Sequence, residues 1–253
     1  MSALSISIIV FACVFGGGLL GMFVSPKLPF HHQSAESKDI VRLGMGLVAT
    51  TVAVVLGLLV SSAKSFYDTQ SNEVTQLAAN FVMLDRIMAQ YGPEAGDARA
   101  ALRSALADQM ESRDSSRHSN KLYSNIKSGA QVGNGMINKI QELSPRDDNQ
   151  RSLKAQAVST AFQLGQTRWL MFEQNTIPVP RLLLAMLILW LIVLFLSFGL
   201  FAPRNLMVMA GLFMAAAAVC GAILLILEMY HPQVGLIQVS DAPLRAALAQ
   251  LGQ

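Results

Sequence analysis

Four long apolar stretches constrain this sequence more than any other feature. They cover residues 4–24, 40–62, 182–201 and 206–227. A helix rises about 1.5 Å per residue, so about 20 apolar residues cross the hydrocarbon core of a bilayer, which is about 30 Å thick. The sequence therefore predicts an integral membrane protein of the all-α class with four membrane-spanning helices.

The composition agrees with this prediction. Of the 253 residues, 53% are hydrophobic and only 14% are charged, whereas charged residues make up about 25% of soluble proteins. Most charges lie between Lys64 and Arg181, where acids and bases alternate, so no basic stripe for nucleic acid forms. Cys13 and Cys220 sit inside apolar stretches without the spacing of metal ligands, and the sequence predicts neither a metal site nor a cofactor.

The order of the apolar stretches predicts the topology. The first stretch lacks a basic leader and a small-residue cleavage site, so we interpret it as a retained span. Prolines interrupt the short linkers within each pair of spans, which favours tight returns. The predicted parts are a first hairpin (1–62), a helical domain continuous with the second and third spans (63–180), a second hairpin (181–227) and a tail (228–253). The amino terminus, the domain and the tail are then on one side.

The helical domain begins as a continuation of the second span. The helix is expected to end at the Gly92-Pro93 turn, because proline cannot continue it. Further helices are expected over 94–111, 118–143 and 147–174, and no alternating strand pattern appears. Apolar or small side chains recur along the continuing rod at intervals close to 3.5 residues, at Phe66, Val74, Leu77, Phe81, Leu84, Met88 and Tyr91.

Several segments together resemble the bestrophin-like domain family of bacterial membrane proteins. They are residues 41–63 (VRLGMGLVATTVAVVLGLLVSSA), residues 84–94 (LDRIMAQYGPE), the Ile177-Pro178 pair and residues 235–245 (GLIQVSDAPLR). The resemblance implies kinship with bestrophins, pentameric ion channels whose four-span protomers line the pore with the second span and carry cytoplasmic helices. It also implies a multi-pass protein of the bacterial inner membrane with its central domain and both termini in the cytoplasm.

The second span carries a stripe of small and hydroxyl residues at intervals of three to four positions. The stripe suits a pore wall, because small side chains leave room for water. It also suits a close contact between helices. Arg42 at one end, and Lys64 and Asp68 at the other, could bias which ion enters or could simply anchor the helix at the interface. The stripe consists of Gly46, Thr50, Ala53, Gly57 and Ser61.

A second group of candidate residues surrounds the turn after the long rod. Oppositely charged residues lie on both sides of this turn, so ion pairs between helices or subunits are expected, with a structural role. The group consists of Asp85, Arg86, Tyr91, Gly92, Pro93, Glu94 and Arg99. No catalytic motif occurs in the sequence, and we do not expect an enzyme.

These observations favour a homo-oligomeric ion channel, pentameric by resemblance, with anions slightly preferred. Its partners would be the lipid bilayer, further copies of the chain and small inorganic ions. The alternative is a non-conducting membrane scaffold or signalling protein whose helical stalk binds another protein.

Overall fold

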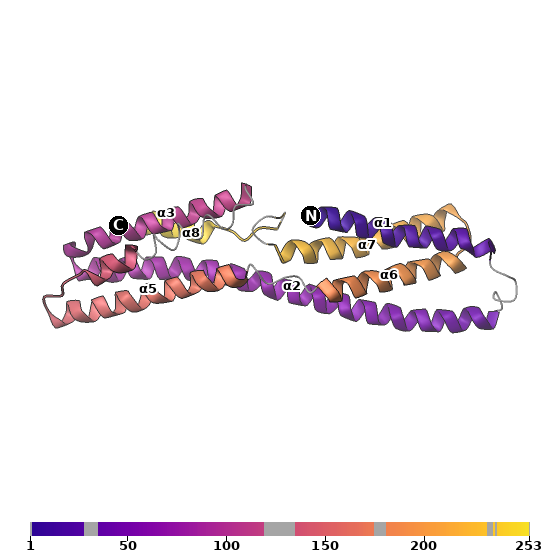
Figure 1. Cartoon of the computed structure of the whole chain (residues 1–253), viewed down its shortest axis with the longest axis horizontal. Coiled ribbons are helices and arrows are strands. Elements are labelled where there is room, and N and C mark those ends of the chain that lie inside the picture. Colours follow the sequence, from indigo (N-terminus) through magenta and orange to yellow (C-terminus); the bar gives the residue numbers. More distant parts are fainter. Residues whose placement is uncertain are drawn as a thin grey trace. The chain divides into compact units, whose positions relative to one another are not determined.

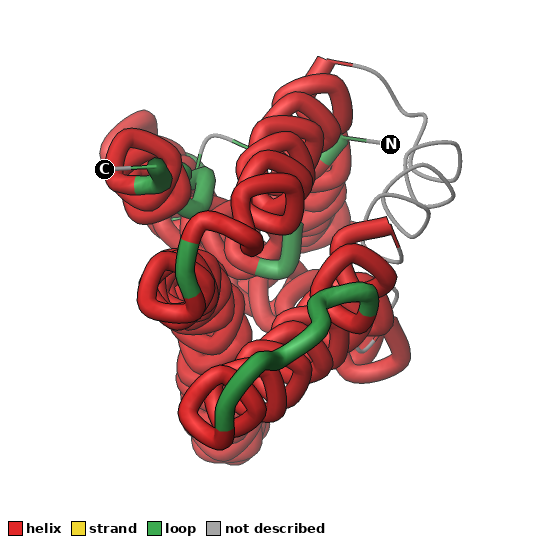
Figure 2. Tube along the Cα trace, turned by 90° about the vertical axis from the view of Figure 1, so that its left-hand side faces the viewer, coloured by secondary structure: helices red, strands yellow, loops and turns green. Residues whose placement is uncertain are grey.

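The computed structural model describes residues 2–27, 35–118, 135–174, 181–231, 235 and 237–252. Across these residues the chain is helical and contains no strand, as Figure 2 shows. The Ile177-Pro178 pair lies outside the described residues. The helices are α1 (Ala3–Val24), η1 (Ser25–Lys27), α2 (Ala35–Tyr91), η3 (Pro93–Ala95), α3 (Gly96–His118), α5 (Asp148–Gln174), α6 (Arg181–Phe201), α7 (Leu206–Met229) and α8 (Ala242–Gln250).

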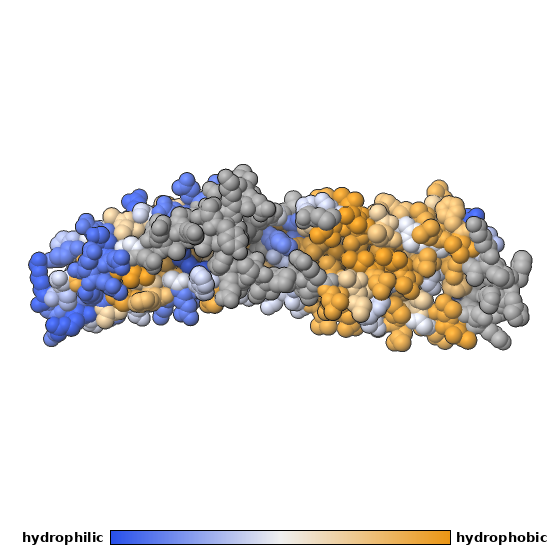
Figure 3. Space-filling model, viewed as in Figure 1, coloured by the Kyte–Doolittle hydropathy of each residue, from blue (hydrophilic) through white to orange (hydrophobic). Residues whose placement is uncertain are grey.

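Four of these helices, α1, α2, α6 and α7, are long and apolar enough to cross a membrane. The prediction of four apolar helices is therefore confirmed. The chain divides into two compact units. The apolar unit comprises Met1–Phe66 and Pro178–Tyr230, and the polar unit comprises Tyr67–Ile177 and His231–Gln253. Helix α2 contributes its first part to the apolar unit and its second part to the polar unit. On the face seen in Figure 3, hydrophobic residues predominate over the apolar unit, which suits a surface in contact with lipid.

Within the apolar unit, α1 packs against α6 and α7 (Figure 1). The contact with α6 is close because glycines line it. A Cβ atom added to Gly199 would overlap the backbone carbonyl oxygen of Gly18, and one added to Gly21 would overlap that of Leu196. Only residues without a Cβ allow the two backbones to approach so closely. The core that the four apolar helices share includes Val10, Val14, Val52, Leu59, Ala63, Leu187, Leu191 and Ile223.

Two polar interactions secure the ends of helices in the apolar unit. Arg204, which follows α6, donates two hydrogen bonds to the carbonyl oxygen of Met22, at 3.2 Å from Nε and 2.8 Å from Nη2. Its guanidinium also lies 5.8 Å from the ring centroid of Phe23. A cation at this position satisfies a carbonyl near the end of α1 and complements the helix dipole. At the other end, the hydroxyl groups of Ser62 and Tyr230 lie 3.0 Å apart.

The polar unit is a helical bundle built on the second part of α2. The periodic stripe predicted along α2 is buried from Val74 to Tyr91, as the spacing requires. Helix α3 extends seven residues beyond the expected range of 94–111, and the helix expected over 118–143 is present at residues 135–141 where the structure describes it. The core is formed by Val74, Leu77, Phe81, Leu84, Met88, Leu102, Leu106, Ile140, Leu153, Ala157, Leu164 and Leu244.

The tail contains a helix that the sequence analysis did not predict. Helix α8 has a proline in its first turn, and its Leu244 and Ala247 are buried in the polar unit. Asp241, just before α8, forms an ion pair with Arg113 of α3 at 3.0 Å between Oδ1 and Nε. The tail is thus an integral part of the bundle.

Candidate pore-forming face of helix α2

The small-residue stripe of α2 lies on the surface of the protomer. Gly46, Thr50, Ala53, Gly57 and Ser61 are all exposed. A Cβ atom added to either glycine would have open space around it, with no atom of another helix within 4 Å among the described residues. The stripe is therefore not used for packing between the helices described within one protomer.

The opposite face of α2 provides the packing instead. Val52, Leu59 and Ala63 are buried against the other apolar helices. Each residue turns an α-helix by about 100°, so these three positions lie roughly opposite the small stripe. One face of α2 thus holds the helix in the protomer, and the other is left for lipid, water or another copy of the chain.

A second exposed stripe runs beside the first, and the sequence analysis missed it as a candidate surface. It contains Leu43, Leu47, Val54 and Leu58, whose exposed fractions lie between 59% and 77%. At 100° per residue, these positions cluster about a quarter turn from the small stripe. The three-to-four-residue spacing of these large side chains was the available signal. The free side of α2 therefore has a small, partly hydroxylated strip and a bulky aliphatic strip.

Two threonine hydroxyl groups on this free side bond to the backbone of their own helix. Thr50 Oγ1 donates to the carbonyl oxygen of Gly46 at 2.9 Å, and Thr51 Oγ1 donates to that of Leu47 at 3.0 Å. Such bonds to the preceding turn allow a threonine to face an apolar medium without an unpaired donor. Its oxygen can still accept a hydrogen bond from water.

The predicted mouth charges stand at the two ends of the apolar part of α2. Arg42 is exposed and its Nη1 lies 3.6 Å from Oδ1 of Asp39, a loose and solvent-accessible pair. Exposed pairs of this kind contribute little energy, so the guanidinium remains available to other anions. At the opposite end, Lys64 is exposed and Asp68 is half-buried.

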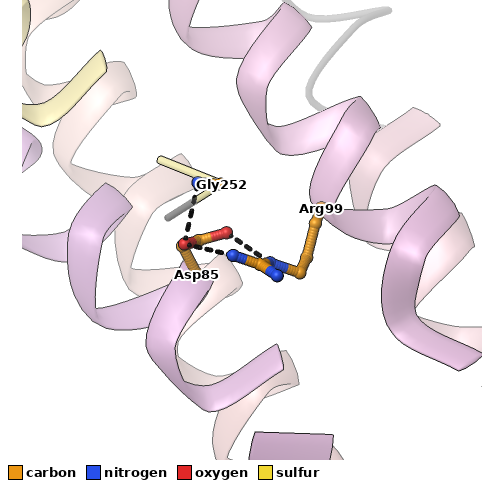
Figure 4. A network of polar contacts seen from close by, with 3 residues as sticks. All are labelled: Asp85, Arg99 and Gly252. Atoms are coloured by element: carbon orange, nitrogen blue, oxygen red, sulfur yellow. Dashed lines mark hydrogen bonds and ion pairs between the residues drawn. The ribbon is translucent and has the colours of Figure 1, made fainter. Parts of the chain in front are cut away.

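The polar unit holds the second group of predicted residues, centred on a buried carboxylate (Figure 4). Arg99 of α3 donates two hydrogen bonds to Asp85 of α2, at 2.7 Å from Nε to Oδ1 and 2.9 Å from Nη2 to Oδ2. The backbone N–H of Gly252 also donates to Oδ2, at 3.4 Å. Burial would raise the pKa of Asp85, but the bonds from Arg99 and Gly252 hold it below its usual value.

This arrangement joins three segments that are distant in the sequence. Asp85 is 6% exposed and the bidentate contact fixes the orientation of the guanidinium. The bond from Gly252 ties the end of the chain to α2 and α3. The sequence supplied the two charged partners, but no spacing rule pointed to the backbone group at the far end of the tail.

The turn after α2 uses its glycine for a backbone conformation. Gly92 has a φ angle of +123°, which residues with a side chain rarely adopt. Glu94 Oε1, beyond the turn, lies 2.9 Å from Nη1 of Arg146, and Gln150 Nε2 donates to the carbonyl oxygen of Tyr91 at 3.0 Å. Pro93 begins the short helix η3, whereas Arg86 is exposed on α2.

Neither the turn nor the Asp85 cluster has the composition of a chemical site. No group of three or more His, Cys, Asp or Glu side chains suited to a metal ion occurs among the described residues. The ion pairs link helices of one bundle and consist of fixed complementary charges, which is the pattern of a structural network. The exposed face of α2 is therefore the strongest candidate for function.

Comparisons with known proteins show which family the sequence matches and which solved structures share the fold. The sequence profile of a family described as Bestrophin-like domain matches residues 12–244. A mutant of a bacterial bestrophin homologue from Klebsiella pneumoniae has a similar structure, with a TM-score of 0.70 and 15% identity, over 99% of this chain and 97% of that one. A second solved structure, of a mutant membrane protein, gives a TM-score of 0.69 at 15% identity, over 98% of this chain and all of the other. No curated protein matches the sequence. The structural likenesses show the shared fold.

Proposed function

The chain belongs to the bestrophin-like domain family, and from this membership we propose that it forms a homo-oligomeric ion channel. The proposed assembly is a pentamer in the bacterial inner membrane, with α2 of each protomer around a central axis. The polar unit and both termini would be in the cytoplasm. The family and the shared fold support an ion-channel kind of function, and the exposed face of α2 supports the choice of pore helix.

One observation carries this proposal. The small stripe of α2 is exposed, and no described atom of another helix lies within 4 Å of a Cβ atom placed at Gly46 or Gly57. The sequence left two interpretations of the stripe, a pore wall and a close helix contact. The open space at these glycines does not favour a close contact with the other described helices of the same protomer, which leaves the axis, a neighbouring protomer or lipid, and we choose the axis.

The two adjacent strips on α2 suit these two roles. We assign Gly46, Thr50, Ala53, Gly57 and Ser61 to the pore, because small and hydroxyl groups permit a hydrated path. The aliphatic strip beside them can then pack against the next protomer, where large apolar side chains fill space. Around a ring of identical helices, each α2 presents the first strip inward and the second sideways.

The mouth charges support a slight preference for anions. Two of the three proposed mouth residues, Arg42 and Lys64, are basic, and only Asp68 is acidic. Rings of basic side chains at the ends of a narrow path raise the local concentration of anions. The expected reversal potential in a chloride gradient therefore lies toward the chloride equilibrium potential.

The test is a recording of single-channel currents from the purified protein in planar bilayers. Replacing Gly57 with leucine places a bulky side chain on the proposed pore wall in every protomer, and we expect the unitary current to fall by at least half. Gly211→Leu is the matched control, because Gly211 is also exposed and open but lies on α7. Equal currents for the two variants, or no current from folded wild-type protein, would contradict the proposal.

The second candidate function is the scaffold that binds another protein. It is favoured by a groove of about 730 Å3 in the polar unit, where α2 and α8 provide walls that include Met83, Ile87 and Ala247. Met83 is 56% exposed, which is unusual for a large apolar residue in a polar bundle. A projection image of the purified oligomer separates the two functions, since a channel requires an open axis and a scaffold does not.

A further inference from the structure

A crevice in the apolar unit has the shape and polarity of a lipid site. It is an open hollow with a volume of about 300 Å3 between the first part of α2 and the last turns of α6. Met45, Gly46, Ala49, Phe198 and Phe201 line it, and Arg42 stands at one end. Apart from this guanidinium and the hydroxyl of Ser197, the side chains of the described lining residues are apolar.

The residues of the crevice are ordered along the direction that crosses the membrane. Arg42 lies near the start of the apolar part of α2, and Ala49 lies seven residues further, which corresponds to about 10 Å along the helix. Phe201 of the lining is the last residue of α6, and Ala202 follows it at the start of the return to α7. The crevice therefore begins at the edge of the apolar layer and runs into the depth that acyl chains occupy.

We propose that this crevice binds an anionic glycerophospholipid, with the headgroup phosphate on Arg42 and one acyl chain between α2 and α6. The crevice is charged at its entrance and apolar inside, so it suits an amphiphile whose polar headgroup binds at the entrance and whose apolar chain fills the interior. Charge complementarity selects an anionic headgroup, as is found for basic pockets between membrane helices. The loose pair with Asp39 leaves the guanidinium free to form charge-assisted hydrogen bonds to a phosphate. The site depends only on membrane insertion, so it does not require that the protein conducts.

The crevice also reaches the face assigned to the pore. Gly46 belongs to both surfaces, since it lines the crevice and lies in the exposed small-residue stripe. An acyl chain in the crevice would support α2 from the side of α6. Lipid occupancy would thus fix the position of a helix segment that, at Gly46, has no side chain of its own to fill the space.

Native mass spectrometry of the full-length protein in detergent tests the proposal, with phosphatidylglycerol as the probe and phosphatidylcholine as the comparison. We expect saturable binding of one phosphatidylglycerol per protomer at this site, about fivefold tighter than phosphatidylcholine, as one basic residue at a membrane surface provides. Glycerophosphoglycerol without acyl chains, at the same concentration, should not displace it. Displacement by this headgroup alone, or equal affinity for the two lipids, would overturn the assignment.

Four substitutions locate the site. Arg42→Gln should weaken phosphatidylglycerol binding about fivefold, and Asp39→Asn should strengthen it, because the neighbouring carboxylate repels the phosphate. Ala49→Leu should fill the crevice and reduce the binding of both lipids. Lys64→Gln is the control, since it removes one positive charge from α2 outside the crevice. Arg42 and Asp39 are exposed, so thermal unfolding should be unchanged in their variants. Unaltered phosphatidylglycerol binding in both Arg42→Gln and Ala49→Leu would exclude the crevice.

Discussion

Replacing Gly199 with alanine should loosen the contact between α1 and α6. The added methyl group would overlap the carbonyl oxygen of Gly18 and would lie 2.9 Å from its carbonyl carbon and 3.0 Å from the backbone nitrogen of Met22. Carbon atoms in ordinary contact are about 3.5 to 4.0 Å apart. Because all three obstacles are backbone atoms, no side-chain rotation relieves them, and the helices must separate by roughly 1 Å.

The loss of stability in Gly199→Ala follows from this separation of α1 and α6. A gap of about 0.5 to 1 Å removes a quarter to a half of the dispersion energy of each contact across the interface. Overpacking of well-packed cores costs about 1 to 3 kcal/mol, and because the neighbours of Gly199 are rigid backbone atoms, we expect Gly199→Ala to cost about 3 kcal/mol. In membranes this loss is not offset by burial of apolar surface from water, since lipid is as apolar as the helix.

The glycines of α1 provide a graded control series. At Gly21 an added Cβ would overlap the carbonyl oxygen of Leu196, so Gly21→Ala should be as damaging as Gly199→Ala. At Gly17 the nearest atom, the carbonyl oxygen of Ile192, lies 3.3 Å away, and a shift of a few tenths of an ångström suffices. Gly16 has open space, so Gly16→Ala should be neutral or slightly stabilising, because alanine favours the helix.

Thermal unfolding of the purified protein in detergent, followed by the loss of the oligomer or monomer peak on size exclusion, measures this order. The apparent midpoint should fall clearly for Gly199→Ala and Gly21→Ala, slightly for Gly17→Ala and not at all for Gly16→Ala. If Gly199→Ala unfolded at the same temperature as Gly16→Ala, the close crossing of α1 and α6 would be wrong.

Three further predictions concern the polar unit. Asp85→Asn removes the negative charge of a buried bidentate pair and leaves the Arg99 guanidinium without a carboxylate partner, so it should destabilise the protein by about 2 to 3 kcal/mol, read from the thermal midpoint. Folding lowers the pKa of Asp85, so the ionised carboxylate stabilises the folded protein above the unfolded pKa of about 3.9. This stabilisation is lost as the pH falls through the lower pKa of the folded state. The thermal midpoint of the Asp85→Asn variant should lack this part of the decrease in acid. Gly92→Ala should cost about 1 to 3 kcal/mol, since its φ is +123° and the new Cβ would lie 2.8 Å from Glu94 Oε2; an unchanged midpoint would refute the assigned turn.

Much of the fold was predictable because lipid imposes a simple rule on helices. A span must be apolar for about 20 residues, and that pattern is visible without knowledge of tertiary contacts. The stripe from Val74 to Tyr91 was equally visible, since helices in a bundle bury one face at a fixed period. Helix α8 was not predicted because it is only nine residues long. A helix so short is stabilised by the packing of residues such as Leu244 and Ala247 rather than by its own helix propensity.

The candidate site was predictable in part. The spacing of Gly46 and Gly57 marked a narrow strip of small residues, but spacing alone could not show whether the strip faced a helix of the same protomer. That depends on which face of α2 carries the better packing side chains, and Leu59 and Val52 decide it in the structure. The aliphatic strip that includes Leu47 was missed because large apolar residues in a span are expected everywhere and become informative only when their exposure is known.

The hydroxyl groups of the strip do not by themselves require water. Thr50 donates to a carbonyl of the preceding turn, so it could face lipid at little cost. The strip is distinguished by its two glycines, Gly46 and Gly57, which have no side chain. A helix that faces lipid gains nothing from glycine, because glycine weakens a helix relative to alanine. Such positions are explained when something must come close to the backbone, either a hydrated ion or another helix. Leucine at Gly57 then separates these two occupants, since a blocked path lowers the current of an intact oligomer, whereas a blocked contact lowers the fraction of protein that assembles.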